Sequence, residues 1–143
     1  MNKQTTHLEF IQSNIARMNQ CSFQMKGWMV TIVSALLALF AASKGTQQAG
    51  NVIYLLIAIV PTIIFWLLDS YYLQQERKFR GIYNNVADLT TGEEQIVIKE
   101  FEMPLHKFNG GKYSFGKVMF SKTEWPLYLP IIVGLAIAGF ILK

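Results

Sequence analysis

The chain has 143 residues, which is enough for one domain, and a formal net charge of +4. Hydrophobic residues make up 52% of it and charged residues only 15%, against about 25% in ordinary soluble domains, so the composition favours a membrane protein. The single cysteine, Cys21, excludes an internal disulfide framework and a cysteine-based metal site. Because His7 and His106 are far apart and match no zinc motif, we expect neither a metal nor a cofactor.

The first expected element is an amphipathic helix over residues 8–25. Its apolar residues recur at steps of three, four and seven residues, which keep them on one helical stripe: Leu8, Ile11, Ile15, Met18 and Met25. Thr6 and Glu9 predict a capping box at its start. This helix could lie on the membrane surface, pair with a second copy, or pack on the rest of the chain. The polar residues before the first apolar run do not resemble a signal peptide, so we expect that run to stay in the mature protein.

The charge-free run 27–43 predicts a first membrane span. Its 17 residues would make a helix about 26 Å long, near the lower limit for a span. Lys26 and Trp28 at its entrance are typical of an interfacial anchor. Its small residues would allow close approach of another helix: Ser34, Ala35, Ala38, Ala41 and Ala42.

A polar loop over residues 44–51 leads to a second charge-free run, 52–68, which predicts a second span. Pro61 in its middle is expected to kink the helix and to leave a carbonyl near residues 56–57 without its helical partner. The hydroxyl of Thr62 is a candidate to satisfy that group.

The second helix is expected to leave the membrane after residue 68 and to continue to about residue 87, because no turn signal interrupts it. The polar residues of this stretch fall at helical spacing or form a basic cluster, and they are our candidates for contact with another subunit or a ligand: Asp69, Tyr72, Glu76, Arg77, Arg80 and Tyr83. Asp69 either emerges among lipid headgroups, pairs with an Arg or Tyr of a neighbouring helix, or lines a water-filled pore. The basic cluster either fixes topology and binds anionic lipid, or binds an anionic ligand or partner.

Residues 88–124 form the expected cytoplasmic segment, with turns and short strands as an option, for example over 117–121. This segment is too short to bury its own core, so it must lean on the helices or on a neighbouring subunit. Residues 111–117 match the first part of a phosphate-binding loop. Val118 replaces the Ser or Thr that would reach magnesium, and no strand–loop–helix unit surrounds the motif.

Ser121 and Glu124 predict a second capping box, which opens a charge-free run over 125–142. These 18 residues predict a third span, and Pro130 is expected to bend it. With the N-terminus in the cytoplasm, eleven of the thirteen Lys and Arg residues lie on the inner side. The positive-inside rule therefore predicts a multi-pass membrane protein with its N-terminus inside and its C-terminus outside.

The sequence therefore predicts an all-α membrane protein that forms one domain over residues 1–143. No set of nucleophile, base and acid recurs at catalytic spacing, and the paired glutamates suit solvated faces, so we expect no enzyme. No recognised nucleic-acid-binding motif is present.

Two pieces of the chain carry a resemblance to a known family: 26–31 with 34–39, and 65–73 with 76–77 and 79–80, with weaker agreement at 101–103 and 121–123. Together they cover about a third of the chain and resemble the RipA-family octameric membrane proteins of bacterial inner membranes. The resemblance implies a ring-like homo-oligomer, such as an octamer. Relatives of similar layout look like pore-type effectors of phage defence. The Arg-x4-His element of the CRISPR-associated ones is absent, so the resemblance does not extend to RNA cleavage or binding by that route.

Two functions follow from these observations. The first is a homo-oligomeric inner-membrane protein that forms or gates a pore, as an antiviral defence effector that perturbs the membrane. The alternative is a non-conducting scaffold or accessory subunit whose cytoplasmic part binds a protein or a small-molecule trigger. In both, the partners are the lipid bilayer and further copies of the chain.

Overall fold

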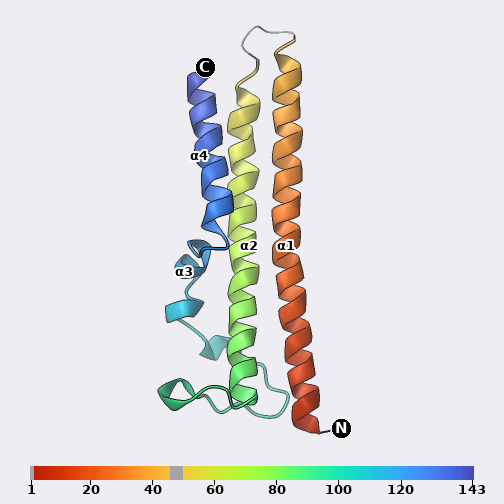
Figure 1. Ribbon diagram of the computed structural model, residues 1–143, viewed down its shortest axis with the longest axis vertical. Coiled ribbons are helices and arrows are strands. Elements are labelled where there is room, and N and C mark those ends of the chain that lie inside the picture. The colour runs from red at the N-terminus through yellow and green to blue at the C-terminus, as the bar shows by residue number, and fades with distance from the viewer. Residues whose placement is uncertain (1, 46–49) are drawn as a thin grey trace.

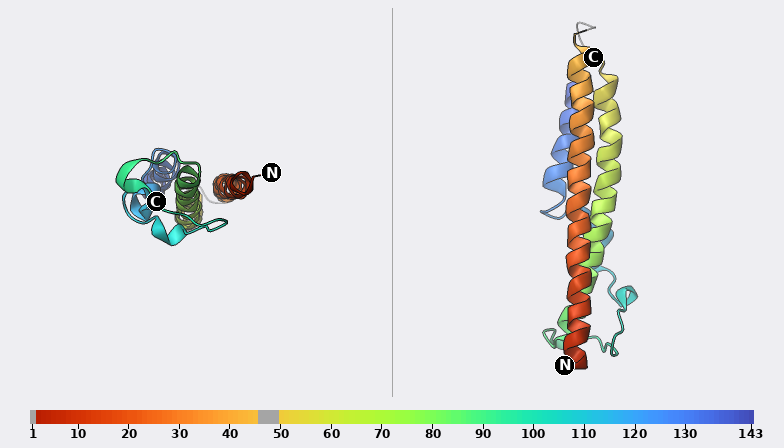
Figure 2. Two further views of the ribbon diagram at one scale, coloured as in Figure 1. Left: turned by 90° about the horizontal axis from the view of Figure 1, so that it is seen from below. Right: turned by 90° about the vertical axis from the view of Figure 1, so that its right-hand side faces the viewer.

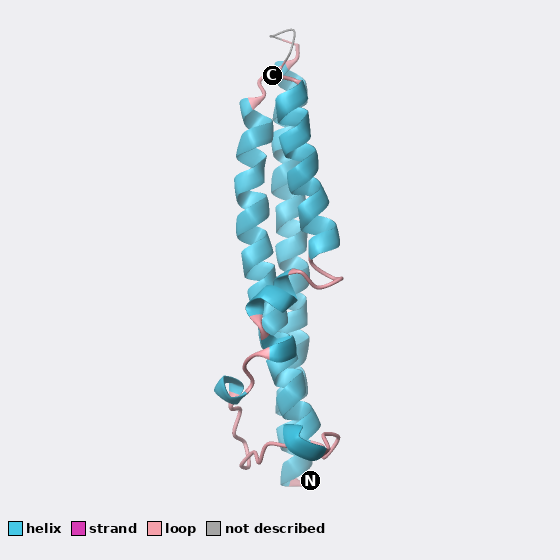
Figure 3. Cartoon of the chain, turned by 90° about the vertical axis from the view of Figure 1, so that its left-hand side faces the viewer, coloured by secondary structure: helices cyan, strands magenta, loops and turns pink. Residues whose placement is uncertain are grey.

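The computed structural model describes residues 2–45 and 50–143, and in that part the chain is all-helical (Figure 1). Its elements in chain order are α1 (Lys3–Ser43), α2 (Ile53–Val86), η1 (Gly92–Glu94), η2 (Leu105–Lys107), η3 (Gly111–Tyr113), α3 (Phe115–Met119) and α4 (Trp125–Ile141). The all-α class is confirmed. The short strand suggested for 117–121 is wrong, since α3 occupies residues 117–119 and the described residues contain no strand (Figure 3).

One continuous helix, α1, replaces the two separate segments expected at 8–25 and 27–43. It contains no proline, and its one glycine, Gly27, has open space around it, so nothing interrupts the backbone hydrogen bonds. The helix also begins earlier than expected. Asn2 caps it by accepting a hydrogen bond from the Gln4 amide at 3.3 Å, which places Thr6 inside the helix and makes the predicted capping box wrong.

The second helix, α2, runs for 34 residues from the apolar run into the charged stretch, as the sequence predicts. It is continuous through Pro61. The hydroxyl of Thr62 donates to the carbonyl of Ala58 at 2.8 Å, and so does not serve the carbonyls near residues 56–57 as expected. The helix ends where the Ala87 amide donates to the Tyr83 carbonyl and Asp88 adopts a positive φ of 55°.

The three long helices lie side by side with α2 in the middle (Figures 1 and 2). α1 runs antiparallel to α2 along its whole length, whereas α4 packs only on the first half of α2. The N-terminus lies at one end of the molecule, and the C-terminus lies at the other, near the end of α1 and the start of α2 (Figure 1).

The molecule has two halves that meet near Asp69. The apolar half comprises residues 27–43, 53–68 and 125–141. Its core is made of residues from all three long helices: Met29, Val33, Phe40, Leu55, Ala58, Trp66, Tyr128 and Leu135. The polar half comprises the remaining turns of α1 and α2 together with the segment between α2 and α4. Its core is smaller: Ile11, Phe79, Ile82 and Phe108.

The amphipathic stripe of α1 therefore packs on its own chain, the third of the alternatives. Ile11 is fully buried, and Ile15 and Met18 pack against the same core. The segment after α2 leans on α2 as expected, with Phe108 as its anchor. Gly81 makes this approach feasible, because an added Cβ would lie 2.5 Å from the Tyr113 hydroxyl and 2.7 Å from the Phe108 ring.

Two helices, α1 and α2, are long and apolar enough to cross a membrane by length and composition, and α4 is shorter, with 17 residues. A core helix of a soluble protein would be mostly buried. In the apolar 18-residue stretch of each helix, only 17% of the residues of α1 and 33% of those of α2 are buried. Of the twenty-six large hydrophobic residues found exposed in the described chain, eighteen belong to the apolar half. This half thus has an apolar exterior as well as an apolar core.

Candidate functional site

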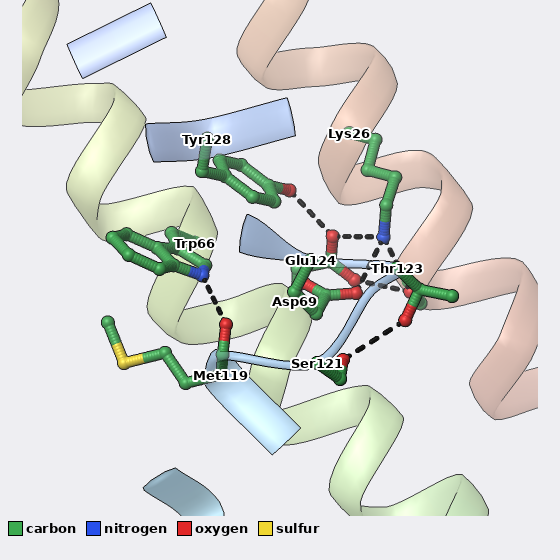
Figure 4. A network of polar contacts seen from close by, with 9 residues as sticks. Lys26, Trp66, Asp69, Met119, Ser121, Thr123, Glu124 and Tyr128 are labelled. Atoms are coloured by element: carbon green, nitrogen blue, oxygen red, sulfur yellow. Dashed lines mark hydrogen bonds and ion pairs between the residues drawn. The ribbon is translucent and has the colours of Figure 1, made fainter. Parts of the chain in front are cut away.

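A cluster of ionisable side chains lies buried where the two halves meet (Figure 4). It draws on all three long helices, and we call it the junction cluster: Ser22 and Lys26 of α1, Asp69 of α2, Glu124 just before α4, and Tyr128 of α4. It forms here because each of these helices has its apolar run end at this level. Antiparallel packing then brings the polar ends of the three runs together.

Asp69 is the centre of the junction cluster and has no exposed surface. One carboxylate oxygen accepts hydrogen bonds from the Lys26 ammonium and from the Tyr128 hydroxyl, the latter at 2.6 Å. The other oxygen accepts from the Ser22 hydroxyl. Asp69 therefore pairs with a tyrosine of a neighbouring helix, one of the alternatives for this residue, and its cationic partner is a lysine rather than an arginine.

Lys26 joins the two acids of the cluster. Its ammonium lies 2.9 Å from Oε1 of Glu124 while it also binds Asp69, and its side chain is only 24% exposed. Burying an ion is costly unless the ion is paired, and removing one partner leaves the other uncompensated. The cluster therefore ties α1, α2 and the start of α4 to one another.

Two carboxyl groups share a single ammonium, so the cluster is neutral only when one carboxyl holds a proton. Burial and, to a smaller extent, the nearby Asp69 charge together raise the pKa of Glu124 to about 7, against the opposing effect of Lys26. Its Oε2 is buried and has no hydrogen-bond partner among the described residues. The arrangement can therefore take up or release a proton near neutral pH.

Trp66, one helical turn before Asp69 on α2, holds the start of α4. Its indole N–H donates to the Met119 carbonyl at 3.1 Å, and its ring stacks on Tyr128 with the centroids 6.0 Å apart. The ring of Phe120 meets Trp66 edge-on at 5.6 Å. Figure 4 shows Trp66, Met119 and Tyr128 beside the junction cluster, and Tyr128 is held by the Trp66 ring as well as by its hydrogen bond to Asp69.

The other predicted contact residues do not join Asp69 in one site. Glu76 is buried, and its Oε1 lies 2.7 Å from a terminal nitrogen of Arg80, whose side chain is 60% exposed. Tyr83 packs against the core of the polar half. Tyr72 is half-buried and meets the Tyr71 ring edge-on at 5.6 Å.

The remaining candidates also lie apart from the cluster. Arg77 donates to the Lys112 carbonyl at 3.2 Å and so contacts the segment after α2. Pro61 and Pro130 lie inside α2 and α4, within the apolar half.

Sequence reasoning missed most of the junction cluster. The sequence predicted that Lys26 anchors the first span at the membrane surface and that Glu124 is the second residue of a capping box. That capping box is wrong, because Glu124 itself precedes the first residue of α4 and makes no side-chain cap, while its carboxylate binds Lys26. The signal available was that Lys26, Asp69 and Glu124 each border a charge-free run on the same predicted side of the membrane.

In the described part of the chain, no group of three or more His, Cys, Asp or Glu side chains could hold a metal ion. The chain matches no family model, no curated protein and no solved structure. The function must therefore be argued from the contacts of this molecule.

Proposed function

We propose that this chain is an integral membrane protein that assembles with further copies of itself and forms or gates a pore in the bacterial inner membrane. The observation that carries the membrane assignment is the apolar exterior, which ends at the level where Lys26, Asp69 and Glu124 become buried and paired. Lipid would cover that exterior, and burial of the ionisable groups avoids the cost of leaving them unpaired at the edge of the hydrocarbon. In this proposal α4 is the third span, and the basic residues place the N-terminus inside.

The far face of α1 supports assembly. The side of α1 turned away from α2 carries small and hydroxylated residues that are all exposed: Thr31, Ser34, Ala35, Ala38, Ala41 and Ala42. Beside it, a hollow is lined by Phe23, Gln24, Gly27, Trp28 and Thr31. Small-residue faces are typical of helix–helix contacts in membranes. Contact between copies through this face suits the ring-like oligomer and the defence role that the family resemblance implies.

The assembly proposal is tested by adding bulk to this face. Ala38→Leu should reduce the mass of the complex in nanodiscs and should lower its conductance in planar bilayers by about tenfold or more, since a well-packed contact loses over 1 kcal/mol on overpacking. Ala136→Leu makes the same change at an exposed position of α4 and should leave both unchanged. An oligomer of unaltered mass in the Ala38 variant would reject this face, and wild-type protein that never conducts would reject the pore.

A second function is favoured by a different observation. Beside the last turns of α2, a cavity of about 460 Å³ is lined by Lys107, Lys112 and several polar residues. A non-conducting membrane scaffold that binds a cytoplasmic partner or small molecule would use such a cavity. Wild-type protein that binds a ligand there and passes no current in any ligand state would favour this function over the pore.

A further inference from the structure

Two adjoining cavities follow the C-terminal turns of α2, and together we call them the basic groove. They have volumes of about 460 and 290 Å³, and they share the lining residues Gly81, Asn84, Lys112 and Tyr113. Ligand pockets generally measure about 300–1,000 Å³, so the groove is large enough for a small molecule.

The lining of the basic groove is cationic. Arg77, Arg80, Lys107 and Lys112 contribute four positive charges, and no acidic side chain of the described chain lines either cavity. The other polar lining is neutral, with Asn84 among the residues common to both cavities. A groove with cations and amide groups but no carboxylate attracts an anion with several acceptor oxygens.

Contacts within the groove and with two neighbouring glutamates hold these cations in position. Arg77 donates to the Lys112 carbonyl at 3.2 Å, and the Lys112 ammonium lies 5.3 Å from the centre of the Tyr113 ring. Arg80 is held by Glu76, as described above. The Lys107 ammonium lies 3.7 Å from a carboxylate oxygen of Glu102. The cations are therefore placed before any ligand arrives, which lowers the entropy cost of binding.

A glycine turn forms one wall. Gly110 and Gly111 have φ values of 74° and 50°, and a Cβ added at either would meet no atom within 4 Å. Backbone conformation rather than crowding thus explains glycine here. Both glycines line the groove, so bare backbone can approach a ligand closely, as in the backbone concavities that bind phosphate.

The position of the groove indicates whether a bound phosphate would come from a phospholipid headgroup or from a soluble molecule. Arg77 and Asn84 follow Asp69 by eight and fifteen residues of the same helix, which places them about 12 to 22 Å beyond the junction cluster. The headgroup layer on each side of a bilayer is about 5 to 8 Å thick. With the junction cluster at the edge of the hydrocarbon, the groove lies in water beyond the lipid headgroups.

We propose that the basic groove binds a phosphate-bearing anion, and that the anion is a soluble organic phosphate rather than a phospholipid headgroup. This inference deepens the ligand-binding role of the cytoplasmic part and rests on the membrane placement proposed above. It does not require that the protein conducts, because the groove and its cations belong to a single chain.

The test is calorimetric titration of inorganic pyrophosphate into full-length protein in phosphatidylcholine nanodiscs. Wild-type protein should bind one pyrophosphate per chain, more weakly as salt is raised. The double variant Arg77→Gln with Lys112→Gln should bind about tenfold or more weakly, since each charged contact contributes over 1 kcal/mol. Both changes leave the Glu76–Arg80 pair intact.

The matched control removes two cations that do not line the groove, Lys78→Gln of α2 with Lys117→Gln of α3. This variant should bind pyrophosphate as wild type does. Equal weakening in both double variants would show that only overall charge matters and would overturn the groove, as would absence of binding to folded wild type. Circular dichroism of each variant establishes that it is folded.

A second arm uses nanodiscs that contain phosphatidylglycerol. Unchanged pyrophosphate affinity there supports a soluble ligand. If wild-type protein binds pyrophosphate in phosphatidylcholine nanodiscs but not in those that contain phosphatidylglycerol, the groove binds a lipid headgroup. That result would overturn the proposal that its ligand is a soluble phosphate. Conductance is measured separately in planar bilayers, so a protein that binds pyrophosphate but carries no current rejects the pore and leaves the groove supported.

Discussion

The apolar and polar halves are built on the same two helices, yet they are stabilised differently. In the apolar half a third regular helix, α4, completes the packing, and the exterior is as apolar as the core. In the polar half the third partner is an irregular segment, with short helical turns and a single buried aromatic anchor, Phe108. Neither α1 nor α2 is interrupted where the halves meet. The two halves therefore differ in two respects: the apolar half has an apolar exterior, and its α2 is covered by a helix rather than by an irregular segment. The buried charges of the junction cluster lie at the boundary between them.

Removing the cation of the junction cluster should have the largest effect. Lys26→Met leaves Asp69 and Glu124 buried without their ammonium, so the free energy of unfolding should fall by about 3–5 kcal/mol. Because α1, α2 and the start of α4 meet there, both halves should loosen together. Reversible unfolding in mixed micelles, followed by circular dichroism, measures the loss.

Lys122→Met is the control for that change, since Lys122 is exposed two residues before Glu124. It should alter the free energy of unfolding by less than about 0.5 kcal/mol. Combining Lys26→Met with Asp69→Asn should recover part of the lost stability, because the uncompensated charge is removed. A double variant no more stable than Lys26→Met alone would contradict the pairing.

A smaller effect, confined to the polar half, is expected from Gly81→Ala. The added methyl would overlap Phe108 and the Tyr113 hydroxyl, and overpacking of this kind costs about 1–3 kcal/mol, partly offset by the better helix propensity of alanine. Hydrogen exchange should rise over residues 96–114 and remain unchanged in the apolar half.

Gly134→Ala is the matched control, because a Cβ at Gly134 in α4 would meet no atom within 4 Å. Faster exchange throughout both halves of the Gly81 variant would show that the polar half does not loosen independently of the rest.

The smallest effect, counted per pH unit, is the change in the free energy of unfolding with pH that Glu124 should cause. Its pKa is raised from 4.5 in the unfolded chain to about 7 in the folded protein, so the folded state holds the proton more tightly. The contribution of Glu124 to stability is therefore greatest below pH 4.5, declines as pH rises to about 7, and is level above that. The slope is at most about 1.4 kcal/mol per pH unit.

Glu124→Gln keeps the neutral form, so its unfolding free energy should lack this decline between pH 5 and 7. Glu93→Gln, at an exposed acid, should retain the wild-type profile. An unchanged pH profile in the Glu124 variant would contradict the proton exchange expected at the junction of the two halves.

The sequence by itself determined the all-helical class, the course of α2 and α4 and the change from apolar to polar residues along the helices, but it did not predict that α1 is one continuous helix. The charge-free runs, the uninterrupted passage from Trp66 to Tyr83 and the helical spacing of Asp69, Glu76 and Arg80 are local patterns, and local patterns depend on neighbours within a few residues. The dependence of the segment after α2 on the helices also followed, from its length alone.

Only the tertiary structure decided which distant residues meet. Lys26, Asp69 and Glu124 are separated by 43 and 55 residues, and their meeting depends on the register at which α1, α2 and α4 pack. The same register places Glu124 among buried side chains, where it does not serve as the helix cap that the sequence predicted. The fold also brought the glycine turn at Gly110 beside the last turns of α2. The sequence could not predict this contact, because side-chain complementarity decides how elements far apart in the chain pack, and it leaves no periodic pattern in the sequence.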